Sequence, residues 1–142
     1  MVDVNEQSRN QQNGRVRFSD DGVGDAIQVQ VDLEQLDGDL CVLSVEGELD
    51  LYTAPVFDRA LTAALANESA RVIVDLTSCT LIDSTSLGLL VKANKHLTRR
   101  ASPRIAVACP DPIMRKVFEI TALHRFLVLH STLDSALECA PG

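Results

Sequence analysis

One stretch of the chain contains the residues that decide its fold: Leu81-Ile82-Asp83-Ser84-Thr85-Ser86-Leu87-Gly88-Leu89-Leu90. It follows a short β-branched run, residues 72–76, of the kind that forms a buried strand. It leads into a segment with helical spacing, whose apolar face holds Leu87, Leu90, Val91, Asn94 and Leu97. Charged residues lie away from that face: Lys92, Lys95, His96, Arg99 and Arg100. Three consecutive hydroxyl residues therefore stand where a strand ends and a helix begins.

The start of a helix suits a hydroxyl or a phosphate, because its first N–H groups are unpaired and its dipole favours negative charge. A purely structural explanation also exists. Asp83 or Ser84 at this position is ordinary N-capping, which stabilises a helix by roughly 0.5–2 kcal/mol and needs no function. A functional interpretation therefore depends on the rest of the chain.

Length and composition predict one soluble domain. The chain has 142 residues, of which 46% are hydrophobic, enough for a single core. A net charge of −7 argues against nucleic-acid binding, which needs a basic face. The sequence has no apolar run long enough to span a membrane and no signal segment at its start. We therefore expect a cytoplasmic protein with no membrane partner.

The cysteines and histidines do not form a metal-binding pattern. The cysteines are Cys41, Cys79, Cys109 and Cys139, spaced about thirty or more residues apart, with no C-x-x-C pair and no ligand spacing to the three histidines. The sequence also lacks a P-loop and a G-x-G-x-x-G motif. We expect no metal, no cofactor and reduced thiols.

The first part of the chain differs from the rest. Residues 1–26 have few apolar side chains to bury and predict a disordered tail, within which the alternation of residues 15–18 is compatible with a short edge strand. The folded domain is expected to cover residues 27–138, followed by a short tail at 139–142.

The order of predicted elements is β-β-α-β-α-β-α-β-α. Strands are expected at 27–31, 40–45, 72–76, 104–108 and 126–129, and helices at 53–66, from Ser84 onward, after Pro112 and at 131–138. Thr53 is expected to cap the first helix, with Pro55 in its first turn. The helix after Pro112 has a predicted apolar side of Ile113, Val117, Phe118 and Ile120. This order predicts an α/β fold with a mixed, mostly parallel sheet and an N-terminal antiparallel hairpin.

The polar residues that follow the strands are expected to gather at one edge of the sheet. Asp50 ends one strand, Cys79, Asp83 and Ser84 follow the next, and Cys109 follows the third. The carboxyl ends of parallel strands meet at the same edge, where ligands and partners bind. That grouping is more informative than any of its members alone.

Three motifs in this order resemble the STAS domain: Gly47-Glu48-Leu49-Asp50, Val74-Asp75-Leu76 and Ile82-Asp83-Ser84-Thr85-x-Leu87-Gly88. The resemblance is closest to bacterial anti-sigma factor antagonists and covers roughly residues 27–138. It implies a small switch whose unphosphorylated form binds an anti-sigma factor, a serine kinase with an ATP-binding fold, and so releases the sigma factor. The resemblance also implies phosphorylation on Ser84, reversed by a phosphatase.

The same resemblance marks a partner-binding surface. The expected contact residues are Asp50, Tyr52, Asp83, Ser84, Thr85, Ser86 and Leu89. The family usually has glycine at the position of Ser86, so this serine is expected either to change how closely a partner approaches or to act as a decoy acceptor. Tyr52 is expected either to anchor the interface, as aromatic residues often do, or to pack on the first helix.

Two other functional classes remain open from the sequence. In an enzyme, Ser84 would be a nucleophile oriented by Asp83, but no histidine is expected at the same edge and no G-x-S-x-G elbow is present. In a scaffold or sensor STAS domain, the same motif would occur without a phosphorylation cycle.

Cys79 and Cys109 form a candidate redox pair. Cys79 is expected in the loop after one strand and Cys109 at the end of the next, and neighbouring strands are about 4.8 Å apart. A redox-sensitive disulfide is one interpretation, and two buried thiols that act as small apolar side chains are the other.

Overall fold

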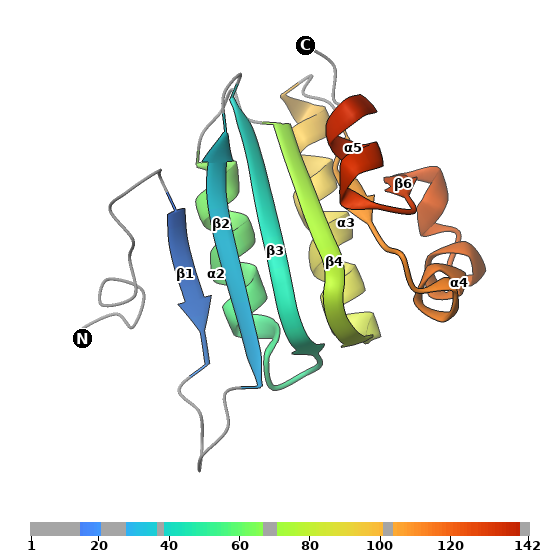
Figure 1. The fold of residues 1–142 in the computed structure, drawn as a ribbon, viewed down its shortest axis with the longest axis horizontal. Coiled ribbons are helices and arrows are strands. Elements are labelled where there is room, and N and C mark those ends of the chain that lie inside the picture. The colour runs from blue at the N-terminus through green and yellow to red at the C-terminus, as the bar shows by residue number, and fades with distance from the viewer. Residues whose placement is uncertain (1–14, 21–27, 37–38, 67–70, 101–103, 140–142) are drawn as a thin grey trace.

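The chain forms a six-stranded sheet in the order β1-β2-β3-β4-β5-β6, with helices on both faces (Figure 1). The structure is a computed structural model that describes residues 15–20, 28–36, 39–66, 71–100 and 104–139. The strands are β1 (Arg15–Ser19), β2 (Val29–Leu36), β3 (Leu40–Leu49), β4 (Arg71–Ile82), β5 (Ala106–Ala108) and β6 (Val128–His130). The β1–β2 and β2–β3 pairs are antiparallel and the other three are parallel. The predicted mixed α/β sheet is confirmed.

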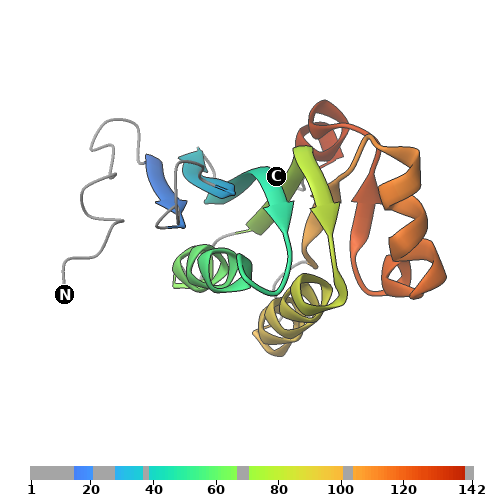
Figure 2. The same ribbon diagram turned by 90° about the horizontal axis from the view of Figure 1, so that it is seen from below.

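The helices form two layers around this sheet. Figure 2 shows α2 (Ala54–Leu65) and α3 (Ser84–Arg99) side by side below the sheet and α5 (Leu133–Cys139) above it. Beyond β6 lie α4 (Pro112–Ile120) and the short 3₁₀ turn η1 (Leu123–Arg125). Because α2 and α3 both follow parallel strands, both helices begin at the carboxyl edge of the sheet.

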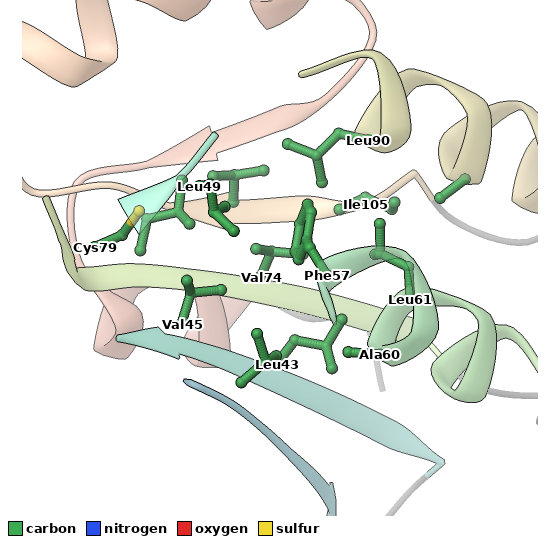
Figure 3. Close-up of a cluster of buried hydrophobic side chains, with 14 of the residues drawn as sticks. Leu43, Val45, Leu49, Phe57, Ala60, Leu61, Val74, Cys79, Leu90 and Ile105 are labelled. Atoms are coloured by element: carbon green, nitrogen blue, oxygen red, sulfur yellow. The ribbon is translucent and has the colours of Figure 1, made fainter. Parts of the chain in front are cut away.

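The main core lies between the sheet and the pair α2 and α3. Buried residues alternate along β2 at Val29, Val31 and Leu33, so the strand turns one apolar face to this layer. Phe57 of α2 is fully buried in the same cluster as Val74 of β4 (Figure 3). Burial of one such aromatic side chain stabilises the fold by about 1.5–3 kcal/mol. This packing fixes the two helices, and therefore their first turns, against the sheet.

A single buried amide ties α3 to the second half of the sheet. The side-chain N–H of Asn94 donates to the carbonyl oxygen of Phe126 over 3.0 Å, and its Oδ1 accepts the backbone N–H of Ile105 at 2.9 Å. Asn94 was predicted on the buried face of this helix, and that placement is confirmed. Val91, predicted on the same face, is only half-buried.

A smaller core lies on the opposite face, under α5. It contains Ala136 of α5 together with Val42 of β3, Ile73 of β4 and Ala108 of β5. The middle strands are therefore apolar on both sides, which is why residues 72–76 read as a continuous apolar run interrupted only by Asp75.

The strand β4 is longer than predicted. It runs from Arg71 to Ile82 and pairs with β3 as far as Leu49, with irregularities in the register between Ser44 and Glu46 and again after Gly47. The sequence pattern ended the strand at residue 76 because exposed polar residues follow. Cys79 consequently lies within β4, and its predicted place in a loop is wrong.

The segment 15–19 also differs from the prediction of a disordered tail. It forms β1, where Phe18 is buried and Arg17 forms an ion pair with Asp32 of β2 at 2.9 Å. The expected edge strand is confirmed, and the tail prediction is wrong for these residues. The other parts of the predicted tails, 1–14, 21–26 and 140–142, lie outside the described residues.

Two helix predictions need correction. Thr53 occupies the N-cap position of α2, but its hydroxyl makes no capping bond to the helix and donates to the carbonyl oxygen of Glu48 over 2.7 Å. In α4 the buried residues are Met114 and Phe118, whereas the predicted core residues Ile113 and Ile120 are exposed. The short α4 presents only one narrow face to the core.

Gly47 is required by the backbone near the end of β3. Its φ is +110°, and a Cβ there would overlap the carbonyl oxygen of Gln28. The same carbonyl accepts the backbone N–H of Glu48 at 3.1 Å. The glycine lets β2 stay close to β3 just before the chain turns at Asp50.

Candidate functional site

The carboxyl ends of β3 and β4 lie side by side. Leu49 pairs with Ile82, and the backbone N–H of Asp83 donates to the carbonyl oxygen of Leu49 over 3.0 Å. The turn after β3 and the first turn of α3 are therefore neighbours. We call the resulting region the carboxyl-edge surface, formed by Asp50, Leu51, Tyr52, Leu81, Asp83, Ser84, Thr85 and Gly88.

Asp50 organises the turn after β3. Its Oδ1 accepts the backbone N–H groups of Tyr52 at 2.9 Å and Thr53 at 3.0 Å, and lies 3.2 Å from the hydroxyl of Thr53. The Asp50 backbone N–H donates in turn to that hydroxyl over 2.9 Å. One oxygen of the carboxylate is thus bonded within the turn itself, and it shapes the turn that carries Tyr52.

Asp83 has the matching role at the next strand end. It is the N-cap of α3, with extended backbone angles, and its Oδ1 accepts the backbone N–H of Ser86 at 3.1 Å. Ser84 and Thr85 follow as the first two residues of the helix, and both are exposed. Their hydroxyls therefore stand at the positive end of the helix dipole, as the sequence predicted.

Ser86 is placed differently from its two neighbours. Its side chain is fully buried, and its Oγ has no hydrogen-bond partner among the described residues. Burial argues against the predicted decoy acceptor and against a direct partner contact of this side chain while the first turn of α3 is intact. The other predicted role, a change in how closely a partner approaches, stays a prediction. A buried hydroxyl without a partner costs about 1–3 kcal/mol.

Large apolar side chains are exposed around the two aspartates. Tyr52 is 83% exposed and Leu51 is 63% exposed, in the turn that Asp50 holds. Leu81, next to Asp83, is 45% exposed. The alternative that Tyr52 packs on the first helix is wrong. Sequence reasoning missed Leu51 and Leu81, although strand alternation outward from buried Ile82 would have placed Leu81 outside.

Gly88 is a further residue of this surface that sequence reasoning used only as part of a motif. It lies one helical turn after Ser84 and is exposed, and a Cβ at this position would meet no atom within 4 Å. Nothing in the fold requires glycine there, yet glycine in a helix costs roughly 0.5–1 kcal/mol relative to alanine. Leu89, the next residue, is half-buried in the groove between α2 and α3, apart from Ser84.

Three cysteines, Cys41, Cys79 and Cys109, are buried and free. Cys79 on β4 and Cys109 after β5 belong to the same core cluster. The register pairs Asp75 with Ala108, so Cys109 is level with Leu76 and offset from Cys79 along the strands. Strand spacing alone therefore understates their separation. The redox disulfide stays a prediction, and non-reducing peptide mapping after mild oxidation tests it.

Burial makes these thiols weak acids. It raises the pKa of Cys79 and of Cys41, and it raises the pKa of Cys109 to about 11. Thiolate is the reactive form, so few of these groups are reactive near neutral pH. The geometry favours the structural interpretation of the cysteines over a fast redox sensor.

One histidine lies at the carboxyl end of a strand, contrary to prediction. His130 ends β6, and its Nδ1 lies 3.1 Å from the hydroxyl of Ser135 in α5. No hydrogen bond within the described ranges joins a histidine to Ser84. The described residues also contain no cluster of three or more metal-ligating side chains and no helix long and apolar enough to cross a membrane.

Fold and site together define an α/β domain that presents exposed hydroxyls and apolar side chains at the carboxyl edge of its sheet. The chain belongs to the STAS domain family, whose model matches residues 30–136. It is similar to the anti-sigma-B factor antagonist of Listeria monocytogenes, with 35% identity over 97 residues that cover 68% of this chain and 84% of that protein. The anti-sigma-F factor antagonist RsfB of Mycobacterium tuberculosis is 26% identical over 103 residues, which cover 72% and 83% of the two chains.

Solved structures support the same fold. An anti-sigma factor antagonist from Mycobacterium paratuberculosis has a TM-score of 0.71 and 28% identity, covering 82% of this chain and 96% of that one. The unphosphorylated form of the anti-sigma factor antagonist SpoIIAA has a TM-score of 0.64, with 23% identity and coverage of 76% and 93%. The resemblance found in the sequence is therefore confirmed for family and fold.

Proposed function

We propose that this protein is an anti-sigma factor antagonist that binds an anti-sigma factor through the carboxyl-edge surface and so frees a sigma factor. The observation that supports this best is the side-by-side placement of the Asp50 turn and the Ser84 helix start. It joins exposed hydroxyls to exposed apolar anchors on one protein-binding surface. The names of the Listeria and Mycobacterium relatives supply the class of partner.

The partner in this proposal is a serine kinase of the histidine-kinase-like ATPase fold, and Ser84 is its acceptor. A phosphate adds about −1.5 to −2 charges beside Asp83. In the free domain that repulsion is offset by the helix N-terminus, which favours a negative charge by roughly 0.3–1 kcal/mol, and by solvent. In the complex, a buried unpaired charge costs about 2–5 kcal/mol, so phosphorylation weakens binding far more than it weakens the fold.

The cycle is completed by a serine phosphatase, and the protein itself is not an enzyme. It acts in the cytoplasm, where sigma factors act. The absence of a contact between Ser84 and a histidine within the described residues supports a substrate role for this serine over that of a nucleophile. The alternative is a scaffold or sensor module that is not phosphorylated. The experiment must distinguish it from the phosphorylated switch.

The test is a phosphorylation assay with the cognate anti-sigma kinase, isolated by pull-down and identified by mass spectrometry. With Mg-ATP, the wild type is expected to gain one phosphate on Ser84, and Ser84→Ala none. Thr85→Ala is the matched control, because Thr85 is the neighbouring exposed hydroxyl, and it is expected to be modified normally. Absence of modification in a complex that does form favours the scaffold, and stoichiometric modification of Ser84→Ala refutes the assignment of the acceptor.

A further inference from the structure

A groove of about 430 Å³ runs between α2 and α3, on the side of the domain away from the sheet. Its floor is apolar and consists of Leu61 and Leu65 from α2 and Leu89 and Ala93 from α3. Leu65 and Leu89 are only partly buried, although both pack against the main core. Apolar hollows of a few hundred Å³ with a small number of polar groups are typical of small-molecule sites.

The rim of the groove carries charge of one sign along α3. Lys92, His96 and Arg99 line that side at successive turns, and no ion pair within the described ranges occupies Lys92 or Arg99. On α2 the polar lining residues are Asp58 and Thr62. Because the two helices run in the same direction, Asp58 lies toward the carboxyl edge, at the opposite end from Arg99. This basic row stands out in a chain of net charge −7.

Arg100 follows Arg99 at the end of α3 and supports the groove from behind without lining it. Its Nη1 donates to the carbonyl oxygen of Leu65, a groove residue, over 3.0 Å. Its Nε and Nη2 are buried and have no acceptor among the described residues. The charge that faces the groove therefore comes from Lys92 and Arg99.

We propose that this groove binds a small amphiphilic carboxylate of the fatty-acid class. The acyl chain lies on Leu61, Leu65 and Leu89, and the carboxylate lies at the end marked by Arg99. The apolar floor fits a chain without polar groups, and the basic row fits a single negative head group. The site is separate from the carboxyl-edge surface, so the proposal does not depend on the identity of the protein partner.

The probe is decanoate, titrated below its micelle concentration into the full chain labelled with ¹³C in its methyl groups. Saturable shifts of the Leu61, Leu65 and Leu89 methyl signals are expected, with one site by calorimetry. The double variant Lys92→Glu/Arg99→Glu is expected to bind at least tenfold more weakly. Lys95→Glu is the matched control, because Lys95 is exposed on the same helix outside the groove, and it is expected to bind within twofold of the wild type.

Decyltrimethylammonium has the same chain length and the opposite charge. It therefore distinguishes a specific carboxylate site from nonspecific binding to an apolar surface. Its binding is expected to be at least tenfold weaker than that of decanoate. The proposal is overturned by equal binding of the two amphiphiles, by decanoate binding that survives the double charge reversal, or by no saturable shift at all. It is also overturned if raising the protein concentration alone shifts the same methyl signals, since a second copy of the chain would then be the occupant.

Discussion

The carboxylate of Asp50 accepts the backbone N–H of Tyr52 at 2.9 Å, so a hydrogen bond at the surface fixes the chain segment that displays the most exposed aromatic side chain of the described residues. The same oxygen also accepts the backbone N–H of Thr53. The residue that shapes this turn, Asp50, is therefore close to Tyr52, which we propose as a contact of the partner. The two roles can be separated by substitutions that change one and leave the other.

Asp50→Ala is expected to lower the free energy of unfolding by about 1–2 kcal/mol, because it leaves the N–H groups of the turn without their acceptor. Asp50→Asn keeps an acceptor oxygen and is expected to lose less than half as much. Urea denaturation measures both variants. Wild-type stability of Asp50→Ala would show that these hydrogen bonds do not hold the turn.

Tyr52→Ala is expected to weaken binding of the anti-sigma partner by more than about 1 kcal/mol, roughly fivefold, with an unchanged circular dichroism spectrum. The reason is that the Tyr52 side chain is 83% exposed in the free domain, so its removal costs the fold little. Phe126→Ala is the control, since Phe126 is an exposed aromatic residue that precedes β6 at the opposite edge. Equal effects of the two substitutions on affinity would remove Tyr52 from the interface.

Ser84→Glu is expected to reduce partner affinity by thirtyfold or more and to melt within a few degrees of the wild type. A carboxylate in the first turn of α3 gains from the helix dipole while free and is desolvated when the partner covers it. Calorimetric binding and thermal melting are measured on the same sample. A melting temperature that falls in proportion to affinity would mean that the switch acts by unfolding.

Gly88→Ala is expected to stabilise the domain by about 0.5–1 kcal/mol and to weaken partner binding about tenfold. The fold offers free space for the added methyl group, so helix propensity alone sets the gain in stability. Thr98→Ala, on an exposed position near the other end of α3, is the control and is expected to leave binding unchanged. Undiminished binding by Gly88→Ala would show that no partner backbone approaches this turn.

Because the Cys109 thiol is buried, we expect the free energy of unfolding to fall in alkaline solution. Its pKa is about 11 in the folded domain, whereas an unfolded thiol titrates near 8.5, so between these values the unfolded chain has lost a proton that the folded chain retains. The free energy of unfolding should therefore fall as pH rises through this window, by up to about 1.4 kcal/mol per unit. Urea denaturation of reduced protein at pH 8, 9.5 and 10.5 measures it. The fall should be clearly smaller in Cys109→Ala, and parallel curves would contradict the assignment.

The sequence determined the order of elements from β2 onward and the place of the site. Alternating apolar residues in β2, the continuous apolar run in β4 and the Asp83–Ser84 helix start are local signals, and they depend on spacing along the chain. The meeting of Asp50 with Asp83 also followed from sequence, because parallel strands place their carboxyl ends together.

Only the tertiary structure decided which side chains of the site face solvent. Ser84 and Ser86 are two residues apart with the same chemistry, yet one is exposed and the other is buried, because the second lies on the side of α3 that packs against the sheet. The exposure of Ile113, the extension of β4 through Cys79 and the groove beside Lys92 depend likewise on how separate elements pack. The spacing of apolar residues along the chain determines whether a segment forms a helix or a strand. The contacts between elements determine how much of each face is buried.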